Sequence, residues 1–230
     1  MRVFLITEDA ARGAHDVVRR LCRATLSLVD EDADLQQIEW VQLPSVLRPA
    51  ASPSAWATRG DQQENLRDLV ARVAEELLRG QHVFVVWHFD GDQPWSTGRR
   101  DNEERFEAVI RRRVRHHLSS TSMLALERLL TLVPYYSIEA WLFQNSAKLR
   151  DELPEADQLT VARWQESPHI LDDLLKVKDC LGVRDRRNAE LARGWPARQV
   201  YGVGRSFAAV VERWRASEHL ARSLRGITWS

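Results

Sequence analysis

Lysine, cysteine and long apolar runs are scarce or missing in this chain of 230 residues. Its only cysteines, Cys22 and Cys180, each lie in an apolar context typical of a helix, so we expect buried reduced thiols rather than a disulfide or a cysteine metal site. No apolar run is long enough to span a bilayer, and the N-terminus has no signal-peptide pattern. These absences favour a cytoplasmic protein without membrane contact.

An excess of charge of one sign is also missing, because 33 Lys and Arg residues balance 33 Asp and Glu residues. Overall charge therefore gives no reason to expect nucleic-acid binding, and any such binding must come from local patches. Lysine occurs only at positions 148, 176 and 178, so arginine carries nearly all the positive charge. Its planar guanidinium suits phosphate contacts, although coding bias explains so uniform a use of arginine equally well.

Short apolar runs alternate with amphipathic stretches through the first two thirds of the chain. Runs typical of buried strands occupy residues 3–7, 38–41, 83–89 and 129–133. Helical spacing of apolar residues occurs at residues 14–29, 66–78 and 103–118, and a further helix is predicted after Ser137. This alternation predicts an α/β fold with a mostly parallel four-stranded sheet flanked by helices.

The remainder of the chain shows no strong strand pattern. Helices are predicted at residues 159–165, 170–181 and 206–221, and residues 149–155 have the composition of a polar turn. Residues 44–61 contain three prolines and are predicted to form a long irregular loop. We therefore expect an α/β domain over residues 1–146 and a helical C-terminal extension over residues 147–230.

Acidic residues follow three of the four predicted strands. Glu8 closes the first strand, Asp90 and Asp92 close the third in D-x-D spacing, and Glu139 follows the fourth. The carboxyl ends of parallel strands share one edge of the sheet, where ligands bind in open α/β folds. Because acids that converge there repel one another, a divalent cation such as Mg²⁺ or Mn²⁺ is the simplest solution. For the D-G-D segment alone, an Asp-Gly turn is the alternative.

Glu139 has an unusually apolar setting for an acid. Its neighbours include Ile138, Trp141 and Leu142, and a buried glutamate is rarely left without a partner. Ser137 is a plausible N-cap for the helix that contains Glu139. An acid in a first helical turn also interacts favourably with the helix dipole, which is the structural alternative.

Arginines cluster near the D-x-D segment and along the helix that follows it. The candidate contacts to a nucleic-acid backbone are Arg99, Arg100, Arg111, Arg112 and Arg115. A solvated basic face is the alternative. His88 precedes Asp90 by two residues and should share its face of the strand, where it either assists the acids or packs as a structural histidine.

The order of these motifs resembles the Toprim domain of topoisomerases, primases and overcoming-lysogenization-defect nucleases. That family carries a glutamate after its first strand and a D-x-D after its third, matching Glu8 and Asp90-Gly91-Asp92 here. The segment 133–142, VPYYSIEAWL, resembles a segment of small stand-alone Toprim-like proteins from bacterial defence and mobile-element loci. The family often has glycine after its first glutamate, and the nucleases have an acid four residues on, where this chain has Asp9 and Arg12.

The resemblance implies a metal-dependent nuclease acting on DNA or RNA, an effector of an anti-phage defence or toxin system that works with a partner such as an ATPase and that can form a homo-oligomer. Asp90 and Asp92 would hold Mg²⁺ or Mn²⁺, Glu8 would act as general acid/base or ligand, and Glu139 would bind a second ion or orient the first. Arg12 favours a second hypothesis, a non-catalytic Toprim-like module that binds nucleic acid or a partner. A haloacid-dehalogenase-like phosphatase is a third, although its D-x-D usually closes the first strand.

Overall fold

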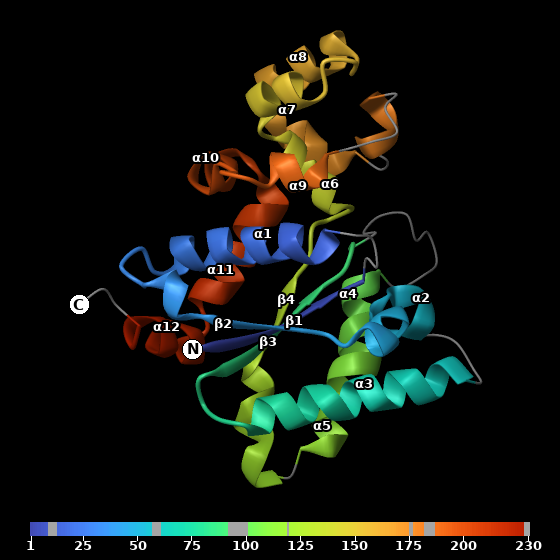
Figure 1. The fold of residues 1–230 in the computed structure, drawn as a ribbon, viewed down its shortest axis with the longest axis vertical. Coiled ribbons are helices and arrows are strands. Elements are labelled where there is room, and N and C mark those ends of the chain that lie inside the picture. The colour runs from blue at the N-terminus through green and yellow to red at the C-terminus, as the bar shows by residue number, and fades with distance from the viewer. Residues whose placement is uncertain are drawn as a thin grey trace.

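The computed structural model describes residues 1–8, 13–56, 61–91, 101–118, 120–174, 177–181 and 187–227. Within these ranges the strands form a single four-stranded sheet in the order β2-β1-β3-β4, and every pairing is parallel (Figure 1). The strands are β1 (Arg2–Thr7), β2 (Glu39–Gln42), β3 (Val83–His88) and β4 (Leu129–Leu132). The predicted α/β class, with a four-stranded sheet flanked by helices, is confirmed.

The two faces of the sheet belong to two separate hydrophobic cores. Along β1, Val3 and Leu5 enter one core, whereas Phe4 and Ile6 enter the other. Successive side chains of a strand point to opposite faces, so a strand buried on both sides must be apolar throughout. This requirement explains the apolar run from Val83 to Trp87 in β3, a strand in which every residue, including the terminal His88, is buried.

Helices from distant parts of the sequence cover these faces. One face lies under α1 (Ala14–Val29) and α11 (Arg205–Arg215), and the other lies against α3 (Asp61–Leu78) (Figure 1). The second face is also covered by a continuous helical stretch made of α4 (Asn102–Arg105), a π-helical turn (Phe106–Arg111) and α5 (Arg112–His117). Most of the predicted helix at 103–118 is therefore present.

The segment predicted as a long irregular loop is more ordered than expected. It contains a 3₁₀ stretch (Ser45–Ala51) and the short helix α2 (Pro53–Trp56). Trp56 is buried edge-on against Trp87 and Phe89, at ring-centroid distances of 6.1 and 5.1 Å. Aromatic burial therefore orders a segment whose prolines and small residues indicated a loop.

The second half of the chain is helical, as predicted, but its segmentation differs. Besides α11, its α-helices are α6 (Ile138–Phe143), α7 (Ser146–Glu152), α8 (Gln158–Glu166), α9 (Asn188–Leu191), α10 (Ala197–Val203) and α12 (Glu218–Arg225). Its 3₁₀ helices are Ser120–Arg128, Pro168–Asp173 and Val177–Leu181, and a further 3₁₀ helix, Leu35–Gln37, lies before β2. The polar turn predicted at 149–155 was wrong in its first part, which belongs to α7. The helix predicted at 206–221 is divided at Ser217, whose hydroxyl accepts from Leu220 N and caps α12.

The helical region after residue 146 shares a hydrophobic core with the sheet. One buried cluster contains Leu5 of β1, Leu21 of α1 and Trp214 of α11. The indole N–H of Trp214 donates to the carbonyl of Thr131 in β4 at 3.0 Å. The boundary predicted between residues 146 and 147 falls at the start of α7, and part of the chain beyond it returns to pack on the sheet.

Two smaller expectations concern the thiols and the membrane. Cys22 is buried as predicted, and burial raises the pKa of its thiol, whereas Cys180 is exposed, contrary to prediction. Among the described helices, none has both the length and the apolar composition that crossing a bilayer requires.

Candidate functional site

Glu8 and Asp90 lie next to each other at the carboxyl edge of the sheet. Glu8 directly follows β1, and Asp90 lies two residues beyond the end of β3. The backbone N–H of Asp90 donates to Glu8 Oε1 at 2.8 Å, and the backbone N–H of Glu8 donates to the carbonyl of His88 at 3.2 Å. Parallel pairing of β1 with β3 therefore brings together two acids that are 82 residues apart in sequence.

The side chain of Asp90 is directed at the start of α6. Its Oδ1 accepts from the backbone N–H of Ile138 at 3.2 Å, whereas Ser137, the predicted N-cap, makes no side-chain capping bond. The carbonyl of Asp90 accepts from Asn102 Nδ2 at 2.9 Å. Contacts with three other segments thus fix the position of Asp90.

Gly91 allows the chain after Asp90 to approach the segment that precedes α6. Its N–H donates to the carbonyl of Pro134 at 3.1 Å, and a Cβ at this position would lie 2.4 Å from the Pro134 oxygen and 2.7 Å from the Tyr135 oxygen. The glycines with positive φ in the described chain are Gly13 and Gly194. Close backbone approach, rather than a left-handed turn, therefore requires glycine in the D-G-D segment.

Glu139 lies in the first turn of α6 and is buried, with 6% of its surface exposed. Its Oε1 accepts from the side-chain amide of Asn188 at 3.0 Å. Asn188 is the first residue of α9, so the helical C-terminal region supplies a direct partner to a predicted site residue. Sequence reasoning missed Asn188, because a single asparagine in a polar segment gives no signal of its destination.

His88 shares the face of β3 that is turned toward α1 and α6. Phe84 and Val86, at alternate positions before it, belong to the core on that side. The ring is 3% exposed, with Nδ1 3.4 Å from Thr7 Oγ1. Burial lowers the pKa of His88 to about 4, although the nearby charge of Glu139 acts in the opposite direction. His88 is therefore a neutral ring beside Glu139 at neutral pH.

Several of the predicted site residues fall outside the described residues. These are Asp92, Arg99 and Arg100, together with Asp9 and Arg12, which mark departures from the Toprim pattern. In the part of the chain that the structure describes, no three or more His, Cys, Asp or Glu side chains form a group that could hold a metal ion. Glu8 and Asp90 supply hard oxygen donors of the type that Mg²⁺ prefers, and Asp92 remains a predicted third.

The predicted nucleic-acid contacts on the 102–117 helical stretch divide into two kinds. The guanidinium of Arg111 binds Glu107 and the carbonyls of Leu126 and Leu129, so it serves the fold. Arg112 and Arg115 are exposed. At 1.5 Å per residue along a helix, Arg112 lies about 15 Å from Asn102, which contacts Asp90, and Arg115 about 20 Å.

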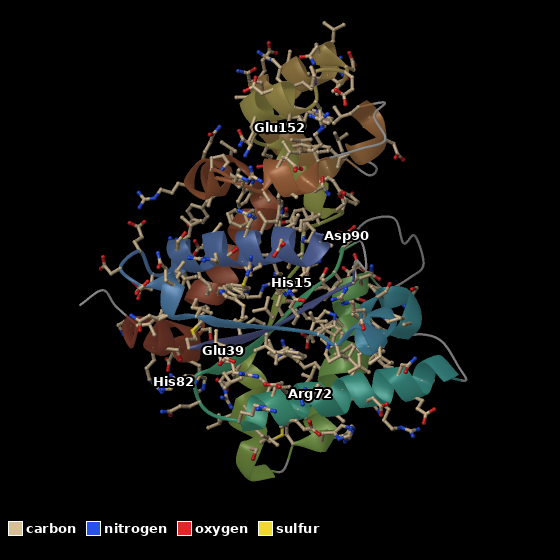
Figure 2. The ribbon with its side chains drawn as sticks, in the orientation of Figure 1. His15, Glu39, Arg72, His82, Asp90 and Glu152 are labelled. Atoms are coloured by element: carbon tan, nitrogen blue, oxygen red, sulfur yellow. The ribbon has the colours of Figure 1, made fainter. Side chains whose placement is uncertain are left out.

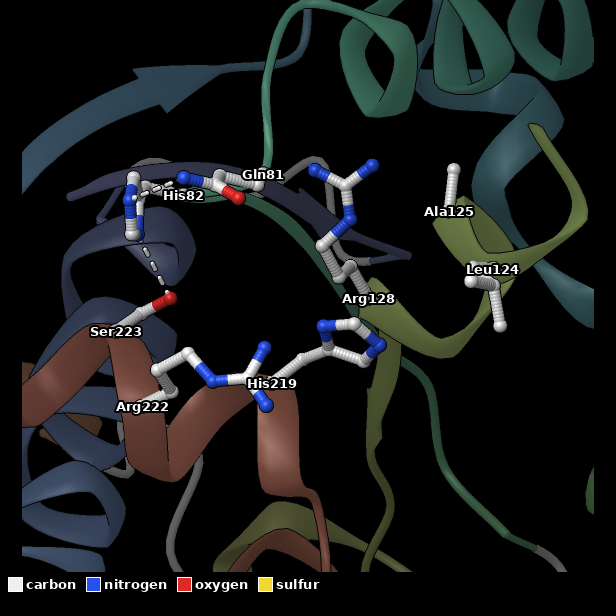
Figure 3. A pocket seen from close by; sticks show the side chains of 8 residues that line it. All are labelled: Gln81, His82, Leu124, Ala125, Arg128, His219, Arg222 and Ser223. Carbon is white, nitrogen blue, oxygen red and sulfur yellow. Dashed lines mark hydrogen bonds between the residues drawn. The ribbon is translucent and has the colours of Figure 1, made fainter. Parts of the chain in front are cut away.

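A cavity at the opposite end of the sheet has a different chemistry. Figure 2 places His82, one of its lining residues, at the other end of β3 from Asp90. The cavity has a volume of about 160 Å³, and Figure 3 shows its lining side chains: Gln81, His82, Leu124, Ala125, Arg128, His219, Arg222 and Ser223. None of these is a carboxylate, so this cavity does not suit a hard cation.

Comparison of the chain with protein-family models, with curated proteins and with solved structures found no match. The geometry of the carboxyl edge is therefore the basis for a functional proposal.

Proposed function

We propose that this chain is a metal-dependent, Toprim-like nuclease that cleaves phosphodiester bonds at the carboxyl edge of its sheet. The observation that carries the proposal is the convergence of Glu8, Asp90 and the start of α6, through the 2.8 Å contact of Glu8 Oε1 with Asp90 N and the 3.2 Å contact of Asp90 Oδ1 with Ile138 N. Glu139 belongs to the first turn of the same helix.

In this proposal, the carboxylates of Asp90 and Asp92, with Glu8 beside them, hold Mg²⁺ or Mn²⁺. The ion, when bound, polarises the scissile phosphate and lowers the pKa of a bound water. Glu8 is oriented by the N–H of Asp90 and acts as a ligand or takes a proton from the attacking water. Glu139, held by Asn188, orients this set or binds a second ion.

Exposed arginines supply the proposed contacts with the backbone of the nucleic-acid substrate. Arg112 and Arg115, with Arg99 and Arg100, contact the phosphate backbone on one side of the cleavage point. Successive phosphates of one strand are spaced along the duplex axis by about 3.4 Å. The separation of about 15 to 20 Å along the helix between Asn102, which contacts Asp90, and Arg112 and Arg115 therefore corresponds to about five base pairs. Arg111 is left out of this interface because its donors bind protein acceptors.

A cleavage assay on plasmid, single-stranded DNA and RNA with Mg²⁺ or Mn²⁺ tests the proposal. We expect metal-dependent cleavage by the wild type and loss of at least about a hundredfold in Asp90→Asn, which keeps an oxygen to accept from Ile138 N but removes a charged ligand. Glu152→Gln, which makes the same type of charge change in α7, is the matched control (Figure 2). Equal rates for the wild type and Asp90→Asn would contradict the proposal.

The second candidate is a non-catalytic module that binds nucleic acid or a partner protein. Arg12, at the position where the nucleases of the Toprim family carry an acid, favours it. Nucleic-acid binding without cleavage in the same assay would support this candidate, whereas hydrolysis of only small phosphate esters would indicate the phosphatase alternative. An effector role in bacterial defence with an ATPase partner rests on the Toprim resemblance alone.

A further inference from the structure

The cavity at the amino end of the sheet is lined by side chains that donate hydrogen bonds and carry positive charge. Its lining comes from three segments: the residues just before β3, the 3₁₀ helix Ser120–Arg128 and α12 (Figure 3). Arg128 and Arg222 contribute two permanent positive charges, and the lining contains no carboxylate. Because buried charge is costly unless it is paired, this composition favours an anionic occupant.

Arg128 is buried, with 7% of its surface exposed, and part of its guanidinium is not used by the fold. It donates to the backbone carbonyls of Leu77, Gly80 and Val83, which connects it to the end of α3 and the start of β3. A guanidinium has five N–H donors, so these three bonds leave two for a ligand. Burial lowers the pKa of Arg128, which is the effect expected of a buried cation that no acid compensates.

A short series of hydrogen bonds leaves the hydroxyl proton of Ser223 available to a ligand. Gln81 Nε2 lies 3.2 Å from His82 Nε2, and His82 Nδ1 lies 3.1 Å from Ser223 Oγ (Figure 3). Because the amide nitrogen of Gln81 can only donate, His82 Nε2 accepts and Nδ1 carries the ring proton. That proton is donated to Ser223 Oγ, so the buried hydroxyl, 4% exposed, can donate its own proton into the cavity.

Arg222 supplies the solvent side of the cavity. It directly precedes Ser223 in α12, and within the described part of the chain its guanidinium has no hydrogen bond or ion pair. His219, in the preceding turn, is different because its Nε2 lies 3.2 Å from the exposed carboxylate of Glu127. Arg222 and the two remaining donors of Arg128 are therefore the positive groups that a ligand would meet.

The size of the cavity limits what it can hold. Its volume of about 160 Å³ corresponds to about five water molecules at about 30 Å³ each, and a phosphate group has five non-hydrogen atoms. Arginine binds phosphate oxygens in pairs, and phosphate offers acceptors toward several sides at once. Leu124, 66% exposed, is also part of the lining and can contact an organic group attached to the phosphate.

We propose that this cavity binds the phosphate group of a small molecule through Arg128, Arg222 and Ser223. His82 and Asp90 are separated by the length of β3, and at about 3.3 Å per residue this places them roughly 25 Å apart, so one small ligand cannot reach both. The inference is therefore independent of the proposed function. Such a ligand connects α12 with the 3₁₀ helix Ser120–Arg128, and it gives the C-terminal helices a binding role.

Calorimetric titration with orthophosphate and with phenyl phosphate at pH 7.5 tests this site. A chelator is present throughout, so that metal binding at the carboxyl edge plays no part. We expect the wild type to bind both compounds, Arg222→Gln to weaken binding about tenfold and Ser223→Ala about three- to tenfold. Tighter binding of phenyl phosphate would identify a phosphate monoester that contacts Leu124 as the ligand, whereas equal binding would identify the free ion.

Arg225→Gln is the matched control, because it removes the same charge from an exposed position of α12 outside the cavity lining. It should leave the affinity within about twofold of wild type. Failure of the wild type to bind either compound, equal affinities for the wild type and Arg222→Gln, or binding of acetate as tight as that of phosphate would overturn the inference.

Asp90→Asn separates this inference from the proposed function. We expect it to bind phosphate like the wild type, because Asp90 lies at the other end of β3. Phosphate binding by a wild-type chain that cleaves no nucleic acid would overturn the proposed function and leave this site standing. Metal-dependent cleavage by a chain that binds no phosphate in chelator would do the reverse.

Discussion

Asp90 accepts a hydrogen bond from the backbone N–H of Ile138 at 3.2 Å, although Ser137 occupies the N-cap position of α6. The hydroxyl of Ser137 has no partner among the described residues, so the carboxylate of Asp90, from the segment that follows β3, performs the capping that a serine usually provides. The acid at the end of β3 therefore connects two elements, and it carries negative charge at the positive end of a helix.

Substitutions of Asp90 should separate the stabilisation that comes from its hydrogen bond to Ile138 N–H from the stabilisation that comes from its negative charge. Asp90→Ala leaves Ile138 N–H without its acceptor and should lower the free energy of unfolding by about 1 kcal/mol. Asp90→Asn retains an acceptor and should cost only a few tenths of a kcal/mol, roughly the lost charge–dipole attraction. Urea denaturation in the presence of a chelator measures both. Equal destabilisation by Ala and Asn would show that the contact with Ile138 does not cap α6.

Gly91 should tolerate no side chain. A Cβ there would lie 2.4 Å from the oxygen of Pro134, and both nearest atoms belong to the backbone and cannot rotate away. We expect Gly91→Ala to lower the free energy of unfolding by about 1 to 3 kcal/mol through overpacking.

Gly202 provides the matched control. It lies in α10, is exposed, and a Cβ added there would meet nothing within 4 Å. Gly202→Ala should raise stability by up to about 1 kcal/mol through helix propensity. Thermal unfolding of both variants measures the contrast, and a stable Gly91→Ala protein would contradict the close approach.

The sheet and the neighbouring acids were predictable because they depend on local patterns. The apolar run of β3 and the alternation of strands with helices predict parallel pairing, and parallel pairing alone places Glu8 and Asp90 at one edge. The register confirms this, because Thr7 is paired with His88, one residue before Glu8 and two before Asp90.

The partners of these acids were not predictable, because they come from tertiary contacts without a sequence pattern. Asn188 and Asn102 are single amides in helix starts, and nothing local indicates that they reach Glu139 and Asp90. Arg111 was predicted to contact phosphate because it is part of a basic run. Its carbonyl partners lie 15 and 18 residues further along the chain and became evident only in the fold.

Arg111 should contribute to stability, whereas Arg112 should not. Arg111 donates to the carbonyl of Leu129 at 2.8 Å, and that carbonyl belongs to β4, which ends the sheet. Arg111→Ala removes two bonds to backbone acceptors and should lower the free energy of unfolding by about 1 to 2 kcal/mol. Arg112→Ala, at an exposed position one residue later, should stay within about 0.5 kcal/mol of wild type.

The same two variants should behave oppositely in nucleic-acid binding. Arg112→Ala should weaken binding about equally for all sequences and reduce the slope of log affinity against log salt by about one. Arg111→Ala should leave that slope unchanged. Fluorescence anisotropy at several salt concentrations measures it, and a slope that responds only to Arg111 would reverse the assignment.

His88 should make the metal-free protein less stable in acid. Burial lowers the pKa of His88 to about 4, compared with 6.5 for an ordinary histidine. Between these values the unfolded chain binds more protons than the folded chain, so stability falls as the pH falls from about 6.5 toward 4 and is independent of this group above that window. The loss attributable to His88 amounts to as much as about 3 kcal/mol. Urea denaturation with a chelator at pH 7.5 and 5 should therefore show a larger loss in wild type than in His88→Gln, since all other titrating groups are common to both proteins. Equal losses would mean that the ring is accessible to protons in the folded state.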